Sequence, residues 1–315
     1  MRYLSIQDPM ETLQVGHDTS FALLIELQKR GWDCFFCDQR DLTLSGDQVW
    51  ARVRRVRVIN RKHDFFKVVG NERVLLSSMN AIGMRKDPPP DEAYRRTCQL
   101  LDLVPPEKTY VFNPPKTLLS FNEKLWTLHF PKWTPETVVS SNMTDLRAFL
   151  KSLGKRSAIA KPVDQFGGEG IFLIRPGDPN TAVTLETLTQ SGRQQIVLQE
   201  YVKAVEKLGD KRVIWVDGRA LGAMTRIPRG GDHRANMVRG GTAHRTKITR
   251  TEQQLIDDIT PALVNHGVIL AGLDIIGGRL TEINFTSPTG LLEVERLARV
   301  ECVTVLTDAI ESRAT

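Results

Sequence analysis

The chain lacks the long apolar segment that a membrane-spanning helix requires. Among its 315 residues there is no run of about 18 or more apolar side chains. The first residues, MRYLSIQDP, read as a short strand rather than as a secretory signal peptide. We therefore expect a cytoplasmic protein with no membrane partner.

Cysteine is also scarce, with four residues in the chain. Cys34 and Cys37 form a C-x-x-C pair, but they lie within WDCFFCDQRDL, which reads as a strand and its exit. A redox pair is expected at the start of a helix that follows a strand. This context favours structural thiols over a redox or metal-binding role.

The chain has an excess of basic residues, but the excess is local. Lysine and arginine number 43 against 37 acidic residues, which gives a net charge of +6 and a pI near 9.2. Between residues 226 and 247 a single acid, Asp232, stands against Arg226, Arg229, Arg234, Arg239, Arg245 and Lys247. The interleaved aromatic residues that favour binding of single-stranded nucleic acid are missing there. The segment suits a small polyanion such as a nucleotide phosphate, and we expect no nucleic-acid partner.

The first third of the chain predicts a parallel α/β unit. A short N-terminal strand is followed by a helix that begins at Asp18 or Thr19 and stops at Gly31, and then by a second strand. Such a βαβ beginning favours a parallel sheet. Alternation over residues 48–59 predicts a half-exposed strand, and residues 91–104 read as a helix.

The rest of the chain predicts an antiparallel sheet flanked by helices. A helix expected at 118–129 adjoins the main domain boundary, which we place at 113–124. Strands then predominate, with a hairpin turned at Asp217-Gly218 and a helix that ends at Gly267. A closing helix is expected at 304–314. The fold class is therefore α/β, with α+β character in the second part.

One candidate phosphate site lies at the end of an apolar strand. Lys161 and Pro162 end this strand and precede the glycine-rich turn DQFGGEG. A lysine that faces a loop of Gly167, Gly168 and Gly170 can reach phosphates that the loop backbone covers. An ordinary hairpin turn with an exposed lysine fits the same residues, because a glycine-rich loop alone is weak evidence. The sequence lacks the P-loop pattern, so a P-loop NTPase is not expected. No long helix follows the turn, so a dinucleotide-binding turn is not expected either.

A second candidate is the segment VLQEYV, residues 197–202. Its apolar strand leads into Gln199, Glu200 and Tyr201 and then into a loop. Such a strand end can form a wall for an adenine ring, with backbone groups after Glu200 reading the edge of the base. A plain strand exit fits the same residues.

A third candidate is the hairpin GLDIIGGRLTEINFTSPTG, residues 272–290, where acids and asparagine are poor strand formers. Glu282 and Asn284 project to one face, because side chains two positions apart share a face. Asp274 joins them only if it lies opposite Glu282. A two-residue turn at Gly277-Gly278 excludes that pairing, whereas a three-residue turn with a bulge permits it. Three oxygen ligands on one face would suit Mg²⁺; carboxylates that are merely solvated at a sheet edge are the alternative.

Several segments together resemble the prokaryotic glutathione synthetases, which are ATP-grasp ligases, over nearly the full length of the chain. They are Asp8-Pro9 with DTSFALLIELQKRG, MRKDPPPD, NEKLWTLHFPKWTPETVVS, KPVDQFGGEGIF, DKRVIWVDG, RIPRGGDHRAN and GLDIIGGRLTEINFTSPTG. The resemblance implies an ATP-grasp fold, with an N-terminal substrate-binding α/β domain at 1–120 and an ATP-grasp domain at 121–315. The latter is expected to divide into a lid subdomain at 125–200 and a C-terminal subdomain at 201–315.

The resemblance also implies which residues bind ATP and its metal ion. Lys124 and Lys161 match the two lysines that contact the phosphates, and Gly167 with Gly168 matches the turn that covers them. The adenine and ribose contacts correspond to Gln199, Glu200, Tyr201, Val202 and, near the ribose, Glu206 or Lys207. The magnesium ligands, which Mn²⁺ could also use, correspond to Asp274, Glu282 and Asn284.

The remaining matched residues concern the two other substrates and the reacting centre. Groups that hold the peptide correspond to Asp18, Ser20, Arg85, Arg212, Ser287, Thr289 and Gly290. Catalytic cations at the reacting centre correspond to Arg226, Lys161 and Arg234, the last within the segment 227–241 that matches a loop closing over the site. The resemblance implies a homo-oligomer, commonly a tetramer.

The implied reaction joins γ-glutamylcysteine and glycine to make glutathione at the expense of ATP. ATP phosphorylates the C-terminal carboxylate of the peptide, and the amine of glycine attacks the acyl phosphate, which releases ADP and phosphate as products. Magnesium and the cations Lys124, Lys161 and Arg226 stabilise the developing negative charge. Because an acyl phosphate hydrolyses readily, the basic segment 226–247 is expected to close over the site and exclude water.

The sequence departs from the family pattern at several positions. Gln165 and Phe166 stand where the family has glycine and then methionine or lysine, and Thr242 stands where an arginine is expected. Leu292 replaces an arginine beside the substrate end of the site, which removes a carboxylate clamp. Two interpretations of the acceptor stay open: glycine, or a different amine joined to a related carboxylate by a paralogous ligase. A catalytically inactive module on this fold would lack the metal ligands or the lysines, and all of them are present.

Overall fold

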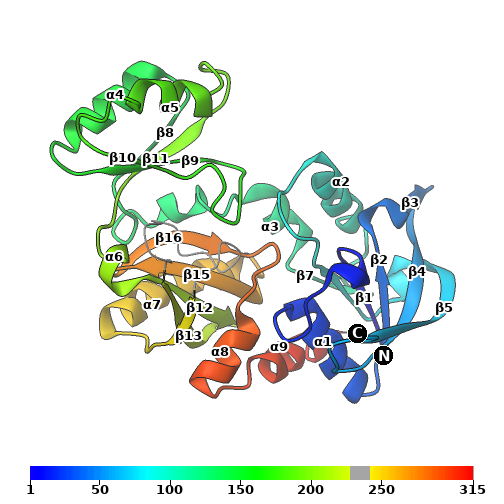
Figure 1. The fold of residues 1–315 in the computed structure, drawn as a ribbon. Helices are drawn as coiled ribbons and strands as arrows, with labels where there is room; N and C mark the ends of the chain where they lie inside the picture. Colours follow the sequence, from blue (N-terminus) through cyan, green and yellow to red (C-terminus); the bar gives the residue numbers. More distant parts are fainter. Residues whose placement is uncertain (228–241, 315) are drawn as a thin grey trace.

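The computed structural model describes residues 1–227 and 242–314. Three β-sheets, each packed against helices, make up this part of the chain (Figure 1). Short 3-10 turns lie at Met10–Thr12, Gln39–Asp41, Leu76–Ser78 and Trp126–His129. None of the helices in the described part is long and apolar enough to cross a membrane.

The first sheet is mixed rather than wholly parallel. Its parallel strands, which the βαβ pattern predicted, are β1 (Arg2–Ile6), β2 (Asp33–Cys37), β6 (Ala81–Met84) and β7 (Tyr110–Phe112). Antiparallel strands extend the sheet beyond β2, where β4 (Gln48–Val58) pairs with it and in turn carries β3 (Leu42–Ser45) and β5 (Phe66–Leu75). The prediction of a parallel sheet is therefore correct for the half that faces the rest of the molecule and wrong for the outer half.

Helices α1 (Thr19–Lys29) and α2 (Glu92–Leu101) cover opposite faces of this sheet. Each begins at an aspartate whose carboxylate accepts a hydrogen bond from a backbone N–H in the first turn, Asp18 for α1 and Asp91 for α2. The cap at Asp18 confirms the helix start that the sequence predicted, and it fixes the turn that leads into α1.

Cys34 and Cys37 lie three positions apart on β2 and therefore on opposite faces of the sheet. Cys34 packs in the core beneath α1, whereas Cys37 packs in the core beneath α2. Both thiols are free and buried, and burial raises the pKa of each above its usual value. Thiols that are separated by the sheet and held protonated agree with the predicted structural role.

The segment between the domains is not the continuous helix that was expected at 118–129. It forms α3 (Pro115–Ser120), a turn over residues 123–125, and the 3-10 turn Trp126–His129. The side chain of Asn122 accepts hydrogen bonds from the backbone N–H groups of Lys124 and Leu125, at 3.0 and 3.1 Å. This local bond competes with helix formation, which explains why the apolar pattern alone was misleading.

The second sheet is small and antiparallel. Its order is β10-β9-β11-β8, with β8 (Thr137–Ser140), β9 (Ala158–Pro162), β10 (Phe172–Ile174) and β11 (Ile196–Glu200). Helices α4 (Met143–Ser152) and α5 (Thr181–Leu188) cover one face. Leu146 of α4 and Leu185 of α5 are fully buried against this sheet.

The third sheet carries most of the polar residues that the sequence singled out. Its order is β14-β13-β12-β15-β16, with β12 (Asp210–Val216), β13 (Arg219–Ile227), β14 (Thr242–Arg245), β15 (Leu270–Ile276) and β16 (Arg279–Asn284). Residues 242–245 were expected to belong to a loop, but they pair with β13 as a strand. The short helix α6 (Val205–Leu208) precedes β12.

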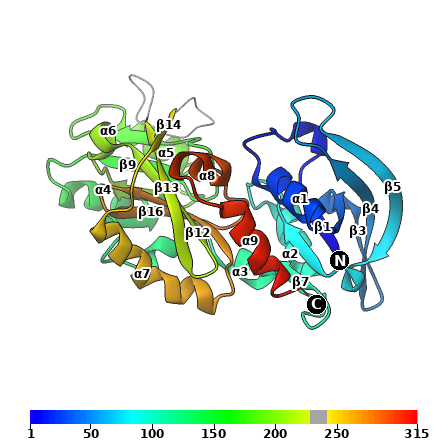
Figure 2. The same ribbon diagram turned by 90° about the horizontal axis from the view of Figure 1, so that it is seen from below.

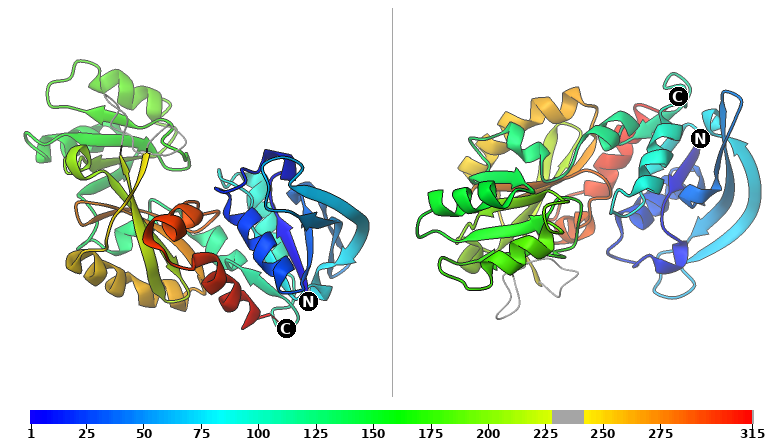
Figure 3. Two further views of the ribbon diagram at one scale, coloured as in Figure 1. Left: turned by 60° about the horizontal axis from the view of Figure 1, so that its bottom comes forward. Right: turned by 90° about the horizontal axis from the view of Figure 1, so that it is seen from above.

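Helices cover both faces of the third sheet. Trp215 on β12 packs on the side of α7 (Arg250–Asn265), and its indole N–H donates a 3.0 Å hydrogen bond to Thr260. Helices α8 (Leu291–Ala298) and α9 (Cys302–Glu311) pack on the other side, where they lie between this sheet and α1 (Figure 2). The second sheet lies over the end of the third that carries β16 (Figures 1 and 3).

Candidate active site

A cavity opens between the second and third sheets, and residues from all parts of the chain line it. The wall includes predicted site residues from the lid side, namely Lys124, Lys161, Gly167, Gly168, Gln199, Glu200, Tyr201 and Val202. It also includes predicted residues from the third sheet and the loop that follows, namely Arg212, Arg226, Asp274, Glu282, Asn284, Ser287 and Thr289. Residues predicted from separate motifs are thus brought together around one space.

The hairpin β15–β16 has the register that a metal site requires. Asp274 lies opposite Glu282, and Gly272 lies opposite Asn284. The three polar side chains therefore lie on one face, and the amide of Asn284 donates a 3.2 Å hydrogen bond to the carboxylate of Asp274. The predicted pairing is confirmed.

The way in which the chain reaches this register differs from the prediction. Ile276 pairs with Arg279, which leaves a two-residue turn at Gly277-Gly278, with φ of 55° and 77°. The predicted three-residue turn is wrong. The extra residue is Thr281, which forms a bulge after the turn and donates a hydrogen bond to the backbone oxygen of Asp274. Glycine is needed in the turn because both residues adopt the left-handed region that favours it.

Asp274 is held by two arginines in the floor of the cavity. Arg212, its partner across β12 and β15, binds both carboxylate oxygens and reaches the backbone oxygen of Thr289 at 3.1 Å. Arg226 lies 2.9 Å from the same carboxylate. Burial alone would raise the pKa of Asp274, but the two guanidinium groups outweigh burial and lower the pKa. Asp274 is therefore a permanent anion at neutral pH.

Asp210 completes this charged cluster, and the sequence analysis missed it. It pairs with Arg226 across β12 and β13 and forms an ion pair with its guanidinium. Burial raises the pKa of Asp210 against the opposing charge of Arg226. The sequence could have indicated it, because Asp210 lies two positions before the predicted site residue Arg212, and side chains two positions apart share a face of a strand.

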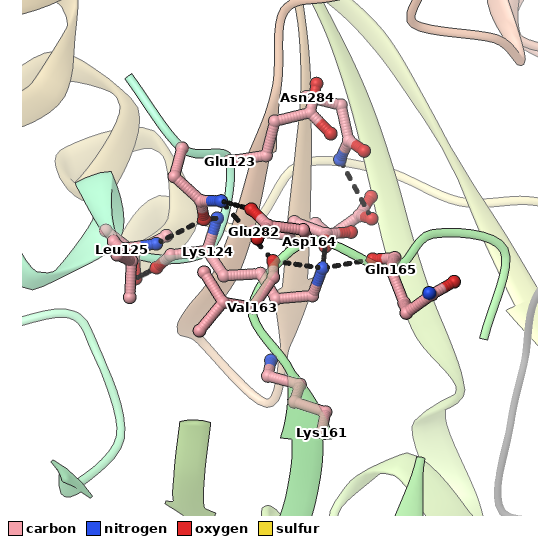
Figure 4. Close-up of polar contacts among 12 residues, drawn as sticks. Glu123, Lys124, Leu125, Lys161, Val163, Asp164, Gln165, Glu282 and Asn284 are labelled. Atoms are coloured by element: carbon pink, nitrogen blue, oxygen red, sulfur yellow. Dashed lines mark hydrogen bonds and ion pairs between the residues drawn. The ribbon is translucent and has the colours of Figure 1, made fainter. Parts of the chain in front are cut away.

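Lys124 lies between the hairpin and the glycine-rich turn, as Figure 4 shows. Its ammonium is 3.4 Å from a carboxylate oxygen of Glu282. It also donates hydrogen bonds to the backbone oxygens of Val163, at 3.2 Å, and Gln165. One lysine therefore links the acidic face of β16 to the loop that was expected to cover phosphates.

Lys161 is buried deeper in the cavity wall, with 7% of its surface exposed. Its ammonium donates a 3.3 Å hydrogen bond to the side-chain oxygen of Gln199. Burial lowers the pKa of Lys161 to about 8, although the carboxylate of Glu282 opposes the shift. A buried, sparsely neutralised cation that faces a cavity is a strong attractant for an anionic ligand.

The strand end at Gln199 to Val202 lines the cavity on the side of the second sheet, next to Lys161, as the adenine hypothesis requires. Gln199 is buried and donates a 2.9 Å hydrogen bond to Thr137 on the neighbouring strand. The carboxylate of Glu200 is bound by Arg156 at 2.9 Å, so it is fixed in place. Lys207 lies exposed on α6 and is not part of the cavity wall.

The residues expected to bind a peptide meet where the first sheet faces the third. Arg85, at the end of β6, is buried and donates a 3.1 Å hydrogen bond to Ser20 at the start of α1. The hydroxyl of Ser287 donates to the backbone oxygen of Arg85 at 3.4 Å. Asp18 caps α1 beside them, and Gly290 begins α8 with a φ of 91°. These four side chains and the glycine thus border one end of the cavity, although only Ser287 lines it directly.

Two further acids at this site had not been identified from the sequence. Asp87 lines the cavity near Ser287, and burial raises its pKa. Glu123 precedes Lys124 and also lines the cavity, and its pKa is raised by burial and by the charge of Glu282. Both lie close in sequence to predicted site residues, but a single acidic residue in such a place does not by itself indicate a functional role.

The positions that depart from the family pattern fall at different places. Phe166 lines the cavity within the glycine-rich turn. Leu292 belongs to α8, and its partly buried side chain packs against the apolar core next to that helix. Thr242 begins the mostly exposed strand β14. Arg234, expected to be catalytic, lies outside the described residues, as does most of the segment 227–241.

The polar face of β15–β16 fits a hard divalent cation by its donor chemistry. Asp274, Glu282 and Asn284 offer carboxylate and amide oxygens, which Mg²⁺ prefers. Over residues 1–227 and 242–314, no three histidine, cysteine or acidic side chains converge as a self-sufficient metal cluster. A cation here would depend on oxygens from a substrate for its remaining ligands, as Mg²⁺ does in nucleotide sites.

Family models of the prokaryotic glutathione synthetases match the chain in two parts. The model of their N-terminal domain matches residues 1–118, and that of their ATP-grasp domain matches residues 123–299. The glutathione synthetase of Escherichia coli strain K12 is 38% identical over 309 residues, which cover 98% of this chain and 97% of that protein. The glutathione synthetase of Salmonella typhimurium strain LT2 is similar to the same extent, at 38% identity over 309 residues.

Solved structures with much lower identity share the fold. A crystal structure of the D-cycloserine synthetase DcsG is 14% identical, with a TM-score of 0.68, and the match covers 98% of this chain and 99% of that one. The ATP-grasp ligase PsnB, solved with a minimal precursor, is 16% identical, with a TM-score of 0.64 and 99% of both chains covered. Both similarities support the ATP-grasp fold that the sequence predicted.

Proposed function

This chain belongs to the prokaryotic glutathione synthetase family, and from that membership we propose how its cavity makes glutathione. The protein is an ATP-dependent ligase of the ATP-grasp class, which joins a peptide carboxylate to an amine. The substrates that we assign to it are γ-glutamylcysteine and glycine. The observation that carries the proposal is that two lysines, two arginines and the three oxygen ligands of the hairpin line a single cavity.

ATP lies in this cavity with its base against the strand end and its phosphates toward the lysines. Backbone groups of Glu200 to Val202 bind the edge of the adenine. Folding buries the ammonium of Lys161 and removes most of its contacts with water. A phosphate that binds there compensates for this lost hydration, so the interaction is strong. Lys124 lies at the edge of the glycine-rich turn, whose Gly167 and Gly168 adopt positive φ and bring backbone N–H groups close to a phosphate.

The face formed by Asp274, Glu282 and Asn284 holds a divalent cation, which we assign as magnesium, with manganese as a substitute. When bound, such an ion neutralises phosphate charge and orients the transferred phosphoryl group. The chain's own contribution is to keep Asp274 ionised and fixed through Arg212, so that the face is preorganised before ATP arrives.

The peptide lies at the end of the cavity bordered by Arg85, Ser20 and Ser287. Its C-terminal carboxylate faces Arg226, which is fixed by Asp210 and Asp274 and cannot leave the floor. The carboxylate oxygen attacks the terminal phosphorus of ATP, the bond to ADP breaks, and an acyl phosphate forms. The amine of glycine then attacks the acyl carbon, loses a proton and expels phosphate. Arg226 and Lys161 stabilise the charge that develops in both steps.

We further propose a cytoplasmic homo-oligomer of the tetrameric kind. The free, buried state of all four cysteines is compatible with a reducing compartment. The N-terminal domain at 1–120 supplies the peptide-binding turn, and the ATP-grasp domain at 121–315 supplies the nucleotide site. Leu292 stands where the family pattern has a guanidinium, so the identity of the amine is the part of the proposal that the following experiment tests.

The amine acceptor can be tested with the purified protein. We expect phosphate release from ATP and Mg²⁺ only when γ-glutamylcysteine is present, and formation of glutathione when glycine is added. If glycine is the natural acceptor, kcat/KM for glycine should exceed that for β-alanine and serine by at least about tenfold, because a single added group in a fitted pocket is worth about 1–3 kcal/mol. Mass spectrometry of the product identifies the amine. Release with another amine but not with glycine would assign the chain to the paralogous ligase, and no release at all would refute the ligase.

A further inference from the structure

Glu123 stands at a junction of three parts of the candidate site. Its backbone oxygen accepts a 2.9 Å hydrogen bond from Ile283, which lies between Glu282 and Asn284 on β16. One oxygen of its side chain accepts from the backbone N–H groups of Phe285 and Thr286, both at 3.0 Å, and from the hydroxyl of Thr286 at 2.8 Å. A single residue therefore binds the chain on both sides of Asn284.

The segment that Glu123 holds leaves its sheet beside a second anchor, because the side-chain amide of Asn113 donates a 2.7 Å hydrogen bond to the backbone oxygen of Phe285. Within the described part of the chain β16 is the last strand of its sheet, so one of its edges has no partner strand there. The chain then leaves the sheet at Phe285 and Thr286 and enters the loop of Ser287 and Thr289, which lines the cavity. Without an acceptor at Glu123, the backbone N–H groups of Phe285 and Thr286, two buried residues, would lose their hydrogen bonds.

The residues on either side of Glu123, Asn122 and Lys124, contact the start of the glycine-rich turn. The side-chain amide of Asn122 donates to the backbone oxygen of Val163 at 3.3 Å and to Asp164 at 3.2 Å. Lys124 spans from Glu282 to Val163 (Figure 4). Asn122, Glu123 and Lys124 thus tie the start of the glycine-rich turn to the polar face of β16 and to the loop after it.

We propose that Glu123 is a positioning residue that fixes Asn284 and the loop of Ser287 in one arrangement, and so links the binding of the cation to the binding of the peptide. The carboxylate acts as a hydrogen-bond acceptor and not as a ligand of the cation. This inference rests on the proposed function, because it takes β16 as the cation face and the Ser287 loop as part of the peptide site.

The test compares Glu123→Ala with Glu123→Gln in the full-length protein. The glutamine keeps an oxygen that can accept the same three hydrogen bonds, whereas alanine keeps none. In the alanine variant we expect binding of Mn²⁺, measured by electron paramagnetic resonance with a non-hydrolysable ATP analogue, to weaken about tenfold. KM for γ-glutamylcysteine should rise by about the same factor. Binding of the nucleotide without metal should change less than about twofold, and Glu123→Gln should stay within about threefold of the wild type.

Glu252 offers a matched control. It is also a buried acid that accepts a hydrogen bond from a backbone N–H, that of Thr249 at 2.7 Å, but it belongs to the capping box of α7 and does not line the cavity. Glu252→Ala should lower the melting temperature and leave Mn²⁺ binding and the peptide KM unchanged. Similar losses in this variant would show that general destabilisation is the cause and would overturn the proposal.

Two other outcomes would also overturn it. If Glu123→Ala kept the wild-type Mn²⁺ affinity and peptide KM, Glu123 would have no positioning role. If Glu123→Gln were as impaired as Glu123→Ala, the charge itself would be needed, and Glu123 would act directly on the cation. The Mn²⁺ titration does not depend on product formation, so a wild-type protein that made no glutathione would refute the proposed function without deciding the role of Glu123.

Discussion

Replacing Asp274 with asparagine is expected to reduce kcat at least about 100-fold and to destabilise the fold by about 3 kcal/mol. Both effects have one cause. Asp274 is the anion that neutralises Arg212 and Arg226 within the floor of the cavity. Asparagine leaves two buried guanidinium groups facing each other with less compensation, and it replaces one of the two carboxylate ligands that we assign to the cation with a neutral amide. Urea unfolding and steady-state kinetics measure the two effects separately.

Glu282 provides the control for this prediction. It belongs to the same face of the hairpin, but a quarter of its side chain is exposed and it pairs with Lys124 alone among the described residues. Glu282→Gln should therefore lose activity to a similar degree while its free energy of unfolding changes by less than about 1 kcal/mol. Full activity in either variant would contradict the assignment of the cation face.

The stability difference at Asp274 should also depend on pH in a defined direction. The arginines hold the pKa of Asp274 below its usual value of 3.8. A carboxylate with a depressed pKa contributes stability that is complete above the unfolded pKa and is lost as the pH falls through the folded one. The difference between the wild type and Asp274→Asn should thus narrow as the pH falls below about 4.

The register of the hairpin shows how far the sequence can specify such a site. Alternation along β16 places Glu282 and Asn284 on one face, and the demand for a third ligand then selects the register with Asp274 opposite Glu282. Both inferences need only local geometry and are correct. The position of the extra residue is different. A bulge at Thr281 and a longer turn give the same register, and the two glycines permit both, so the sequence does not distinguish them.

Other parts of the site depend on contacts between distant segments. Glu123 binds Thr286 across 163 positions of the chain, and no periodic pattern predicts which backbone groups will reach a given acid. Helix α8 was missed for another reason, since Gly290 precedes it in a left-handed conformation with no side-chain cap. A helix without a capping residue has no start signal that can be read from its sequence. The family resemblance supplied part of what local patterns could not, because it related whole segments to one another.

Replacing Lys161 with methionine should remove activity as Asp274→Asn does, but it should stabilise the fold instead of destabilising it. Burial lowers the pKa of Lys161 from 10.5 to about 8, which corresponds to a cost of about 3 kcal/mol for the buried charge at neutral pH. Methionine has a similar length and removes that charge, but it leaves the side-chain oxygen of Gln199 without its donor, at a cost of about 1 kcal/mol. We therefore expect the nucleotide-free variant to be more stable than the wild type by about 2 kcal/mol, with kcat/KM for ATP at least about 100-fold lower.

The pH dependence separates this mechanism from a mere improvement in packing. Below pH 8 both the folded and the unfolded chain keep the proton on Lys161, so the cost of the buried charge is fully present. Between about 8 and 10.5 the folded protein loses this proton first, so the unfolded state binds more protons and the stability of the wild type rises with pH. The advantage of Lys161→Met should therefore shrink over that interval, whereas better packing would give the same difference at every pH.

Lys124→Met is the matched variant at the other lysine that we assign to the phosphates. Lys124 is nearly as buried, with 9% of its side chain exposed, but its ammonium is paired with Glu282 and with two backbone oxygens. Its loss should reduce activity without any gain in stability, because a neutralised cation carries little desolvation cost that could be recovered. ATP should raise the melting temperature of the wild type and should fail to do so in Lys161→Met. If the Lys161 variant were less stable than the Lys124 variant, the cavity would not hold the uncompensated positive charge on which we base phosphate binding.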